Sequence, residues 1–173
     1  MKKLLLLLIS VFLYTGIALA AGPLTAKVTR TNHKTAVKKD AVDKGTFSYK
    51  PGGTMSIVFS ETDKLMMEGT KYTIVRGKRS SVAKGETAAL FGVMQAVVDD
   101  ILSGGNGMVK DAASKGVSVT QNGNDITIAP AGKTKKKLLF SSFVLRVDKK
   151  KHQVLSIRMN GKGKNYTLYE ILY

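Results

Sequence analysis

The sequence predicts a mainly β protein with few helices: an incomplete antiparallel β-barrel, or half-barrel, with a helical lid over its concave apolar face. Two observations lead to this fold class. Residues 45–74 alternate apolar and polar side chains with a period of two, interrupted by Pro-Gly-Gly and Glu-Gly, as in consecutive antiparallel strands joined by tight turns. Residues 86–102 repeat apolar side chains at spacings of three and four, which predicts one face of a helix. A long sheet must curl, close or be covered, and the helix fits across its concave side.

The first twenty residues predict a secretory signal peptide. Met1-Lys2-Lys3 is basic, Leu4 to Ala18 is almost entirely apolar, and Ala18-Leu19-Ala20 forms a small-x-small cleavage site. The apolar run is shorter than the roughly 20 residues that span a bilayer, which favours cleavage after Ala20 over a membrane anchor. We expect residues 21–173 to form a single soluble domain in the periplasm. The chain has no cysteine, so we expect neither a lipoprotein anchor nor disulfides.

Further strands are expected on both sides of the 45–74 block. Leu24 to Val28 predicts a strand, followed by a loop near residues 31–34 and a second strand, and residues 76–79 predict a basic turn. After the helix, Gly104-Gly105 predicts its end, and a second short helix of weak propensity is predicted near 106–115. Asn122-Gly123 predicts a hairpin turn. The later strands are predicted at 117–119, 126–130, 138–147, 154–159 and 166–173, for a total of about nine.

The chain is strongly basic, with 28 Lys and Arg against 12 Asp and Glu and a formal net charge of +16. Part of this excess lies in Lys-rich turns such as 133–137 and 149–151, which are typical of solvated hairpin ends. The charge also suits docking to an acidic protein or an anionic membrane. We expect no nucleic-acid partner, because neither a recognition helix nor an aromatic RNA-binding strand motif is present.

No motif in the sequence predicts an enzyme, a metal site or a cofactor. His33 and His152 lie in polar, Lys-rich surroundings without clustered ligands, so we expect surface histidines. Asp99 and Asp100 would point about 100° apart on a helix, so they predict solvated charges and not a catalytic pair. The Gly-rich run after the helix lacks the Gly-Lys-Ser/Thr ending of a phosphate loop. An enzyme with residues scattered along the sequence remains a weaker hypothesis.

The apolar side chains of the strands and the helix form the candidate binding site. An ordinary dry core is the simpler interpretation of any one of them. Met55, Met66, Met67 and Met94 nevertheless gather in this region, and flexible thioether side chains adapt to variable apolar ligands such as lipid. The residues predicted to line a lipid cavity are Phe47, Tyr49, Met55, Ile57, Phe59, Leu65, Met67, Leu90, Phe91, Met94, Val97 and Ile101.

The order of these parts resembles the periplasmic outer-membrane lipoprotein carrier family (LolA-like). The resemblance depends on the aromatic strand ending in Lys50-Pro51, the apolar strand 55–59, the Gly turn into an aromatic strand, the hairpin 121–130 and the closing strands 143–173. It implies a carrier that ferries the acyl chains of lipoproteins from an inner-membrane release complex to an outer-membrane acceptor. We expect a monomer.

Two details of the resemblance concern the lid. In the family a basic strand residue holds the lid from inside, and Lys50 is the nearest match here. The family usually has an amphipathic helix before the first strand, whereas Leu24 to Val28 already has a strand pattern. The lid would then consist only of the 86–103 helix and its neighbour. The alternative to a carrier is a non-enzymatic basic β-module that docks an acidic partner or an anionic membrane surface through its Lys-rich turns.

Overall fold

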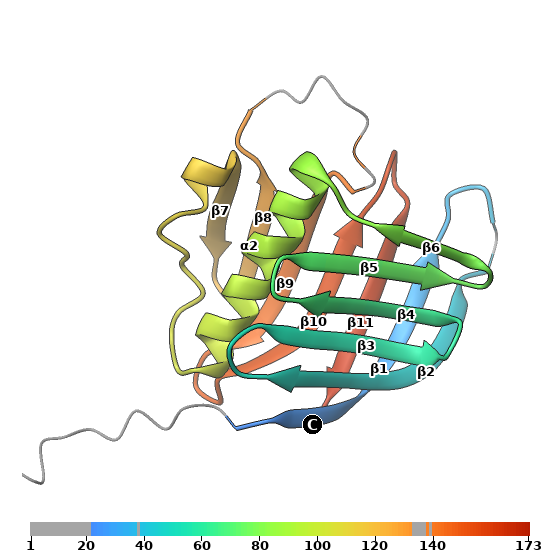
Figure 1. Cartoon of the computed structure of the whole chain (residues 1–173), viewed down its shortest axis with the longest axis horizontal. Helices are drawn as coiled ribbons and strands as arrows, with labels where there is room; N and C mark the ends of the chain where they lie inside the picture. The colour runs from blue at the N-terminus through green and yellow to red at the C-terminus, as the bar shows by residue number, and fades with distance from the viewer. Residues whose placement is uncertain (1–21, 38, 133–137, 139) are drawn as a thin grey trace, which may run out of the picture.

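In a computed structural model, one antiparallel sheet of 11 strands curls around a helix (Figure 1). The structure describes residues 22–37, 39–132, 138 and 140–173. The predicted signal peptide with its cleavage site and the basic run 133–137 lie outside these residues. The elements are β1 (Leu24–His33), β2 (Ala41–Lys50), β3 (Thr54–Ser60), β4 (Asp63–Glu68), β5 (Lys71–Arg76), β6 (Arg79–Val82), α2 (Gly85–Leu102), a 3-10 turn (Ala113–Lys115), β7 (Val117–Asn122), β8 (Asp125–Pro130), β9 (Ser142–Asp148), β10 (Gln153–Asn160) and β11 (Tyr166–Leu172).

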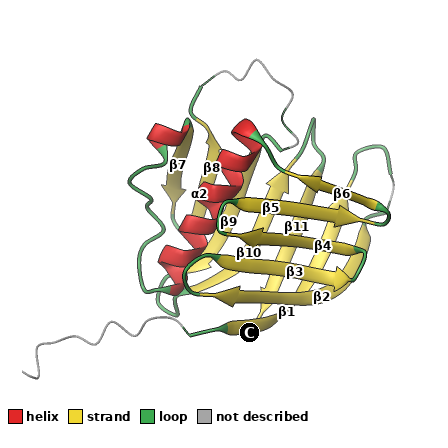
Figure 2. Cartoon of the chain, in the orientation of Figure 1, coloured by secondary structure: helices red, strands yellow, loops and turns green. Residues whose placement is uncertain are grey.

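The strand order makes the sheet an open half-barrel. The order is β6-β5-β4-β3-β2-β1-β11-β10-β9-β8-β7, so β6 and β7 are free edges and the barrel does not close. The first and last strands of the chain, β1 and β11, pair in the middle and join an N-terminal half to a C-terminal half. Strands β2 to β5 cross in front of the β10–β11 part of the sheet in Figure 2, while β7 and β8 lie to the left beside α2. α2 packs on the concave side, against β5 and β7–β10. The predicted fold class is confirmed.

The period-two alternation determines which side chains face the helix. In the β2–β3 hairpin Phe47 lies opposite Ile57 and Tyr49 opposite Met55, and all four are buried. The predicted hairpins of residues 45–74 are confirmed as β2 to β5. Register shifts at Val58/Ser60 and at Val154/Ser156 add irregularities of the β-bulge type, which increase local twist and help the sheet to curl.

Three predicted details differ from the structure. Residues 79–82 form the edge strand β6, which sequence patterning missed because all four side chains are exposed and its one apolar residue, Val82, stands at its end. The second helix predicted near 106–115 is wrong, since these residues form a coil that ends in the 3-10 turn 113–115. The loop expected near residues 31–34 begins later, because β1 continues to His33.

Helix α2 is buried on more than one side. Gly85–Leu102 coincides with the predicted helix, and its chain turns away at Gly104, which has a left-handed φ of 92°. Nine of its residues are buried, and these include Val93 and Gln95 in addition to the seven apolar residues of the predicted face. Gly92 permits close contact with β5, because a Cβ there would lie 2.8 Å from the Tyr72 hydroxyl. A helix that is apolar around most of its circumference is an interior element of the fold.

Candidate functional site

The structure brings together the two predicted sets of lining residues. Eleven of the twelve have side chains no more than 5% exposed, and Phe59 is partly buried and packs against the same core. The strand residues lie on β2, β3 and β4 and the helix residues on α2, and both sets belong to one buried apolar cluster. The backbone of α2 itself lies nearest to β5 and to β7–β10. Whether these side chains contact a ligand stays a prediction.

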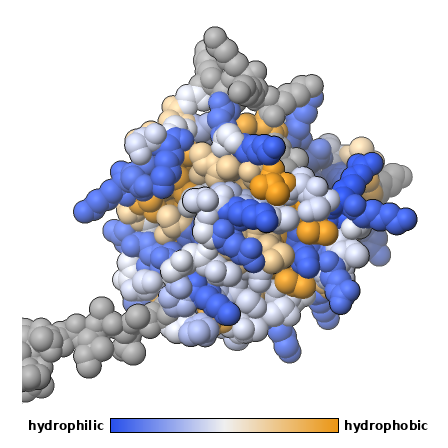
Figure 3. Space-filling view, in the orientation of Figure 1, coloured by the Kyte–Doolittle hydropathy of each residue, from blue (hydrophilic) through white to orange (hydrophobic). Residues whose placement is uncertain are grey.

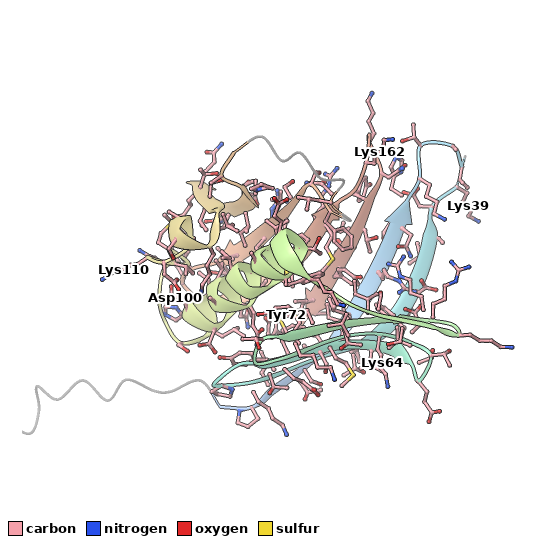
Figure 4. All side chains as sticks on the ribbon, turned by 45° about the horizontal axis from the view of Figure 1, so that its top comes forward. Lys39, Lys64, Tyr72, Asp100, Lys110 and Lys162 are labelled. Carbon is pink, nitrogen blue, oxygen red and sulfur yellow. The ribbon has the colours of Figure 1, made fainter. Side chains whose placement is uncertain are left out.

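The interior between α2 and the wall is filled by side chains. Phe91 is at the centre of an aromatic cluster, with ring centroids 5.8 Å from Tyr72, 5.1 Å from Phe143 and 5.9 Å from Phe140. Figure 4 labels Tyr72 between β5 and the helix. The small cavity beside Phe91 measures about 10 Å³, barely enough for one water molecule. An acyl chain could therefore enter this region only if α2 moved.

Two side-chain hydrogen bonds attach α2 to the sheet among the described residues. The Tyr49 hydroxyl on β2 donates to the Asp99 carboxylate, and the Gln95 amide donates to the Gly53 carbonyl in the β2–β3 turn. Burial and the neighbouring Asp99 raise the pKa of Tyr49 to about 12, so its hydroxyl stays protonated as a donor at neutral pH. The sequence predicted Asp99 to be a solvated charge, but in the structure it accepts this hydrogen bond from the sheet.

Gln95 is a weak point of this attachment. Its side chain is only 7% exposed, and its Oε1 atom is buried without a hydrogen-bond partner among the described residues. A buried, unpaired polar atom costs about 1–3 kcal/mol. The Gly53 carbonyl also accepts a bond from the Gly69 amide at 3.0 Å, so the turn is held independently of the helix. The helix is therefore less firmly fixed here than the strands around it.

Replacing Tyr49 by Phe tests the Tyr49–Asp99 attachment. We expect the free energy of unfolding of Tyr49→Phe to fall by about 1–2 kcal/mol, because a hydrogen bond to a charged group is lost while Asp99 can still reach water. Tyr166→Phe is the matched control, since the Tyr166 hydroxyl forms none of the hydrogen bonds found among the described residues. Urea denaturation measures both. Equal losses for the two variants would contradict a specific attachment.

Lys50, the predicted lid latch, is exposed at the end of β2. It forms no side-chain hydrogen bond or ion pair among those found in the described residues, so its role as a latch stays a prediction. The bond to the helix comes from its neighbour Tyr49, whose side chain points to the opposite, concave face because successive strand residues alternate.

A buried arginine that the sequence analysis did not single out crosslinks the wall at its other end. Arg30 on β1 is 7% exposed and forms hydrogen bonds of 2.7 and 3.0 Å to Asp43 and of 2.6 and 2.8 Å to Asp63. Its guanidinium also lies 4.0 Å from the centre of the Phe59 ring. Burial alone would lower the pKa of Arg30, but the two carboxylates outweigh it and raise that pKa. The network ties β1, β2 and β4 together on the concave side.

The position of Phe59 in this network depends on a glycine. A Cβ on Gly45 would lie 2.7 Å from the Phe59 ring, so only glycine lets this ring pack over β2. Every second residue of β1 faces the interior, and Ala26, Val28 and Arg30 are the buried ones. Because Arg30 follows Ala26 and Val28 at intervals of two residues, this spacing could have predicted that its side chain faces inward.

No protein-family model and no curated protein matches the chain. Among solved structures, it is similar to the crystal structure of LolA superfamily protein NE2245 from Nitrosomonas europaea. The sequence identity is 5%, the match covers 88% of this chain and 85% of that chain, and the TM-score is 0.37.

Candidate metal ligands are not clustered among the described residues. They contain no group of three or more His, Asp or Glu side chains that could hold a metal ion. His33 lies 2.9 Å from an Asp40 oxygen and stacks on Tyr166 with ring centroids 4.8 Å apart. No helix in the part of the chain that the structure describes is long and apolar enough to cross a membrane.

Proposed function

We propose that this protein is a non-enzymatic periplasmic carrier that holds the acyl chains of a lipid or lipoprotein between α2 and the concave face of the half-barrel. One observation carries the proposal: an open sheet with a continuous apolar concave face is occupied by one helix, which two side-chain hydrogen bonds attach to it among the described residues. The adaptable side chains of Met55, Met67 and Met94 lie at this interface.

In this proposal the helix takes the place of the ligand when the carrier is empty. Eight apolar side chains of α2 are buried, and burial of each large apolar side chain is worth about 1.5–3 kcal/mol, or roughly 12–24 kcal/mol in total. An acyl chain of about 15 methylenes gains about 12 kcal/mol at about 0.8 kcal/mol for each methylene. One chain therefore balances a partial displacement of the helix, whereas two or three chains can hold it open. Refilling of the interior by α2 would then help to release the cargo.

The remaining features of the proposal follow from the family that the sequence resembles. Cargo would be received from an inner-membrane release complex and delivered to an outer-membrane acceptor, with the carrier acting as a monomer. The strand β1 begins at Leu24, directly where the family usually has an amphipathic helix. α2 is then the sole helical cover within the described residues, which suits a smaller cargo or a more exposed one.

Photocrosslinking with an acyl-labelled lipid tests the proposal. The purified protein is incubated with phosphatidylcholine that carries a diazirine in its acyl chain, and labelled peptides are identified by mass spectrometry. We expect labels on the peptides that contain Met55, Met67 and Met94, and weaker labelling by a single-chain diazirine fatty acid. Tyr49→Phe should accelerate labelling, because it removes one attachment of α2.

The matched variants are Met94→Asp, in the interior, and Met108→Asp, whose side chain is 46% exposed. Met94→Asp should abolish interior labelling while Met108→Asp leaves it unchanged. An aspartate in the core can also unfold the chain, so the position of the labels on the wild-type protein decides the outcome. Labels confined to the convex face, or none on folded protein, would rule out the carrier. Salt-sensitive binding to anionic surfaces without interior labelling would favour the basic β-module instead.

A further inference from the structure

A cleft lined by several cations lies at the end of the half-barrel away from the Tyr49–Asp99 bond. It has a volume of about 310 Å³ and lies between the β1–β2 loop and the β5–β6 turn. Lys34, Lys39 and Arg76 line it together with Val37, Ala41 and the edge of Arg30. We call this site the basic cleft. Its size falls in the range of sites that hold small organic groups.

The cations of the basic cleft outnumber the carboxylates around it. Lys34, Lys39 and Arg76 take part in none of the ion pairs found among the described residues. Asp63 also lines the cleft, but both of its oxygens are engaged by the guanidinium of Arg30. Arg30 is shared by Asp63 and Asp43, so the four cations Arg30, Lys34, Lys39 and Arg76 stand against two carboxylates. The resulting net charge of +2 gives an anion a positive field.

The basic cleft continues into apolar surroundings through Arg76. This side chain also lines an adjoining cavity of about 260 Å³ beside Phe140 and Met159. It lines the small cavity that reaches Phe59 and Phe91 in the core as well. Cations at the entrance followed by aromatic and thioether side chains match the polarity of a molecule with an anionic head and apolar tails. Val37 in the β1–β2 loop is 51% exposed, which adds an apolar contact at the rim.

We infer that the basic cleft binds the phosphate-bearing headgroup of an anionic phospholipid whose acyl chains extend past Arg76 toward α2. This inference rests on the proposed function and narrows it, because it names the class of lipid that the carrier prefers. Lys34, Lys39 and Arg76 would contact the phosphate region, and Phe140 and Met159 the first methylenes. Hydrophilic residues are spread widely over the face shown in Figure 3. The test must therefore distinguish binding in the basic cleft from binding to surface charge in general.

A competition between two lipids with identical acyl chains tests the inference. The protein is offered equal amounts of phosphatidylglycerol and phosphatidylcholine, and native mass spectrometry gives the ratio of the two bound species. We expect phosphatidylglycerol to dominate at low salt and the ratio to fall as salt increases. In Lys34→Gln/Arg76→Gln the ratio should fall roughly five-fold for each positive charge removed.

The control variant Lys71→Gln/Lys110→Gln removes the same charge elsewhere. Lys71 lies at the opposite end of β5 from Arg76, and Lys110 lies on the far side of the molecule from Lys39 in Figure 4. Its lipid ratio should match that of the wild-type protein. Equal uptake of the two lipids, or equal losses in both double variants, would overturn the inference while leaving the carrier intact. Failure to take up either lipid would instead overturn the proposed function, and the inference with it.

Discussion

Phe91→Ala should lower the free energy of unfolding by about 3–5 kcal/mol, among the largest losses expected in this chain. Phe91 is completely buried on α2 and contacts three aromatic rings from β5, β9 and the segment before β9. Truncation removes its transfer free energy and leaves a cavity that neighbouring strands cannot easily fill, because their positions are set by the sheet. Urea denaturation monitored by circular dichroism measures the loss.

Leu155→Ala is the control for this truncation. Leu155 lies on β10 with its side chain 36% exposed, so removal of its methyl groups creates no enclosed cavity. We expect a change within about 1 kcal/mol. If Phe91→Ala cost as little as Leu155→Ala, α2 would not be packed into the half-barrel in the ligand-free protein.

Arg30→Met should lower the free energy of unfolding by about 2–3 kcal/mol at neutral pH. Removing one partner of a fully buried ion pair costs about 3–5 kcal/mol, but Asp43 and Asp63 have side chains 43% and 30% exposed and can regain water. The methionine preserves the apolar stem, so the loss reports on the two carboxylates and the contact with Phe59. Arg146→Met is the control, because Arg146 pairs with Asp125 at the surface and should cost much less.

The Arg30 network also predicts how stability depends on pH. The hydrogen bonds from Arg30 hold the pKa of Asp63 below its usual range, although burial opposes this. A carboxyl whose folded pKa is depressed adds stability that is complete above its unfolded pKa, near 4, and is lost as the pH falls through the folded value. The difference between wild type and Arg30→Met should therefore shrink below about pH 4. A difference that stayed constant from pH 7 to pH 3 would contradict this account.

The alternation of side chains was enough to predict the fold class and the wall of the site. Phe47, Tyr49 and Met55 face inward because strand parity is a local property, and Leu90, Phe91 and Met94 share a helix face for the same reason. The strand β6 carries no alternation, because its edge position exposes all of its side chains. Patterning could not predict it.

Contacts between distant segments were beyond the reach of patterning. Asp63 meets Arg30 only because three successive hairpins set the register from β1 to β4. The partner of Tyr49 depends on the rotation of α2 about its axis, which is fixed by packing against five strands. Whether the interior holds a cavity depends on volumes, and here Phe140, from outside the predicted lining, helps to fill it.

The pairing of β1 with β11 has a consequence for how this protein folds. Among the described residues these are the first and last strands, and they form the seam between the two halves of the sheet. Each half can assemble from local hairpins, whereas the seam joins segments far apart in the sequence, and such non-local pairing is expected to slow folding. Until β11 pairs with them, β1 and β10 are additional unprotected edges, open to pairing with other chains. Strand β11 therefore joins the two halves of the sheet and also covers two strand edges that could otherwise aggregate.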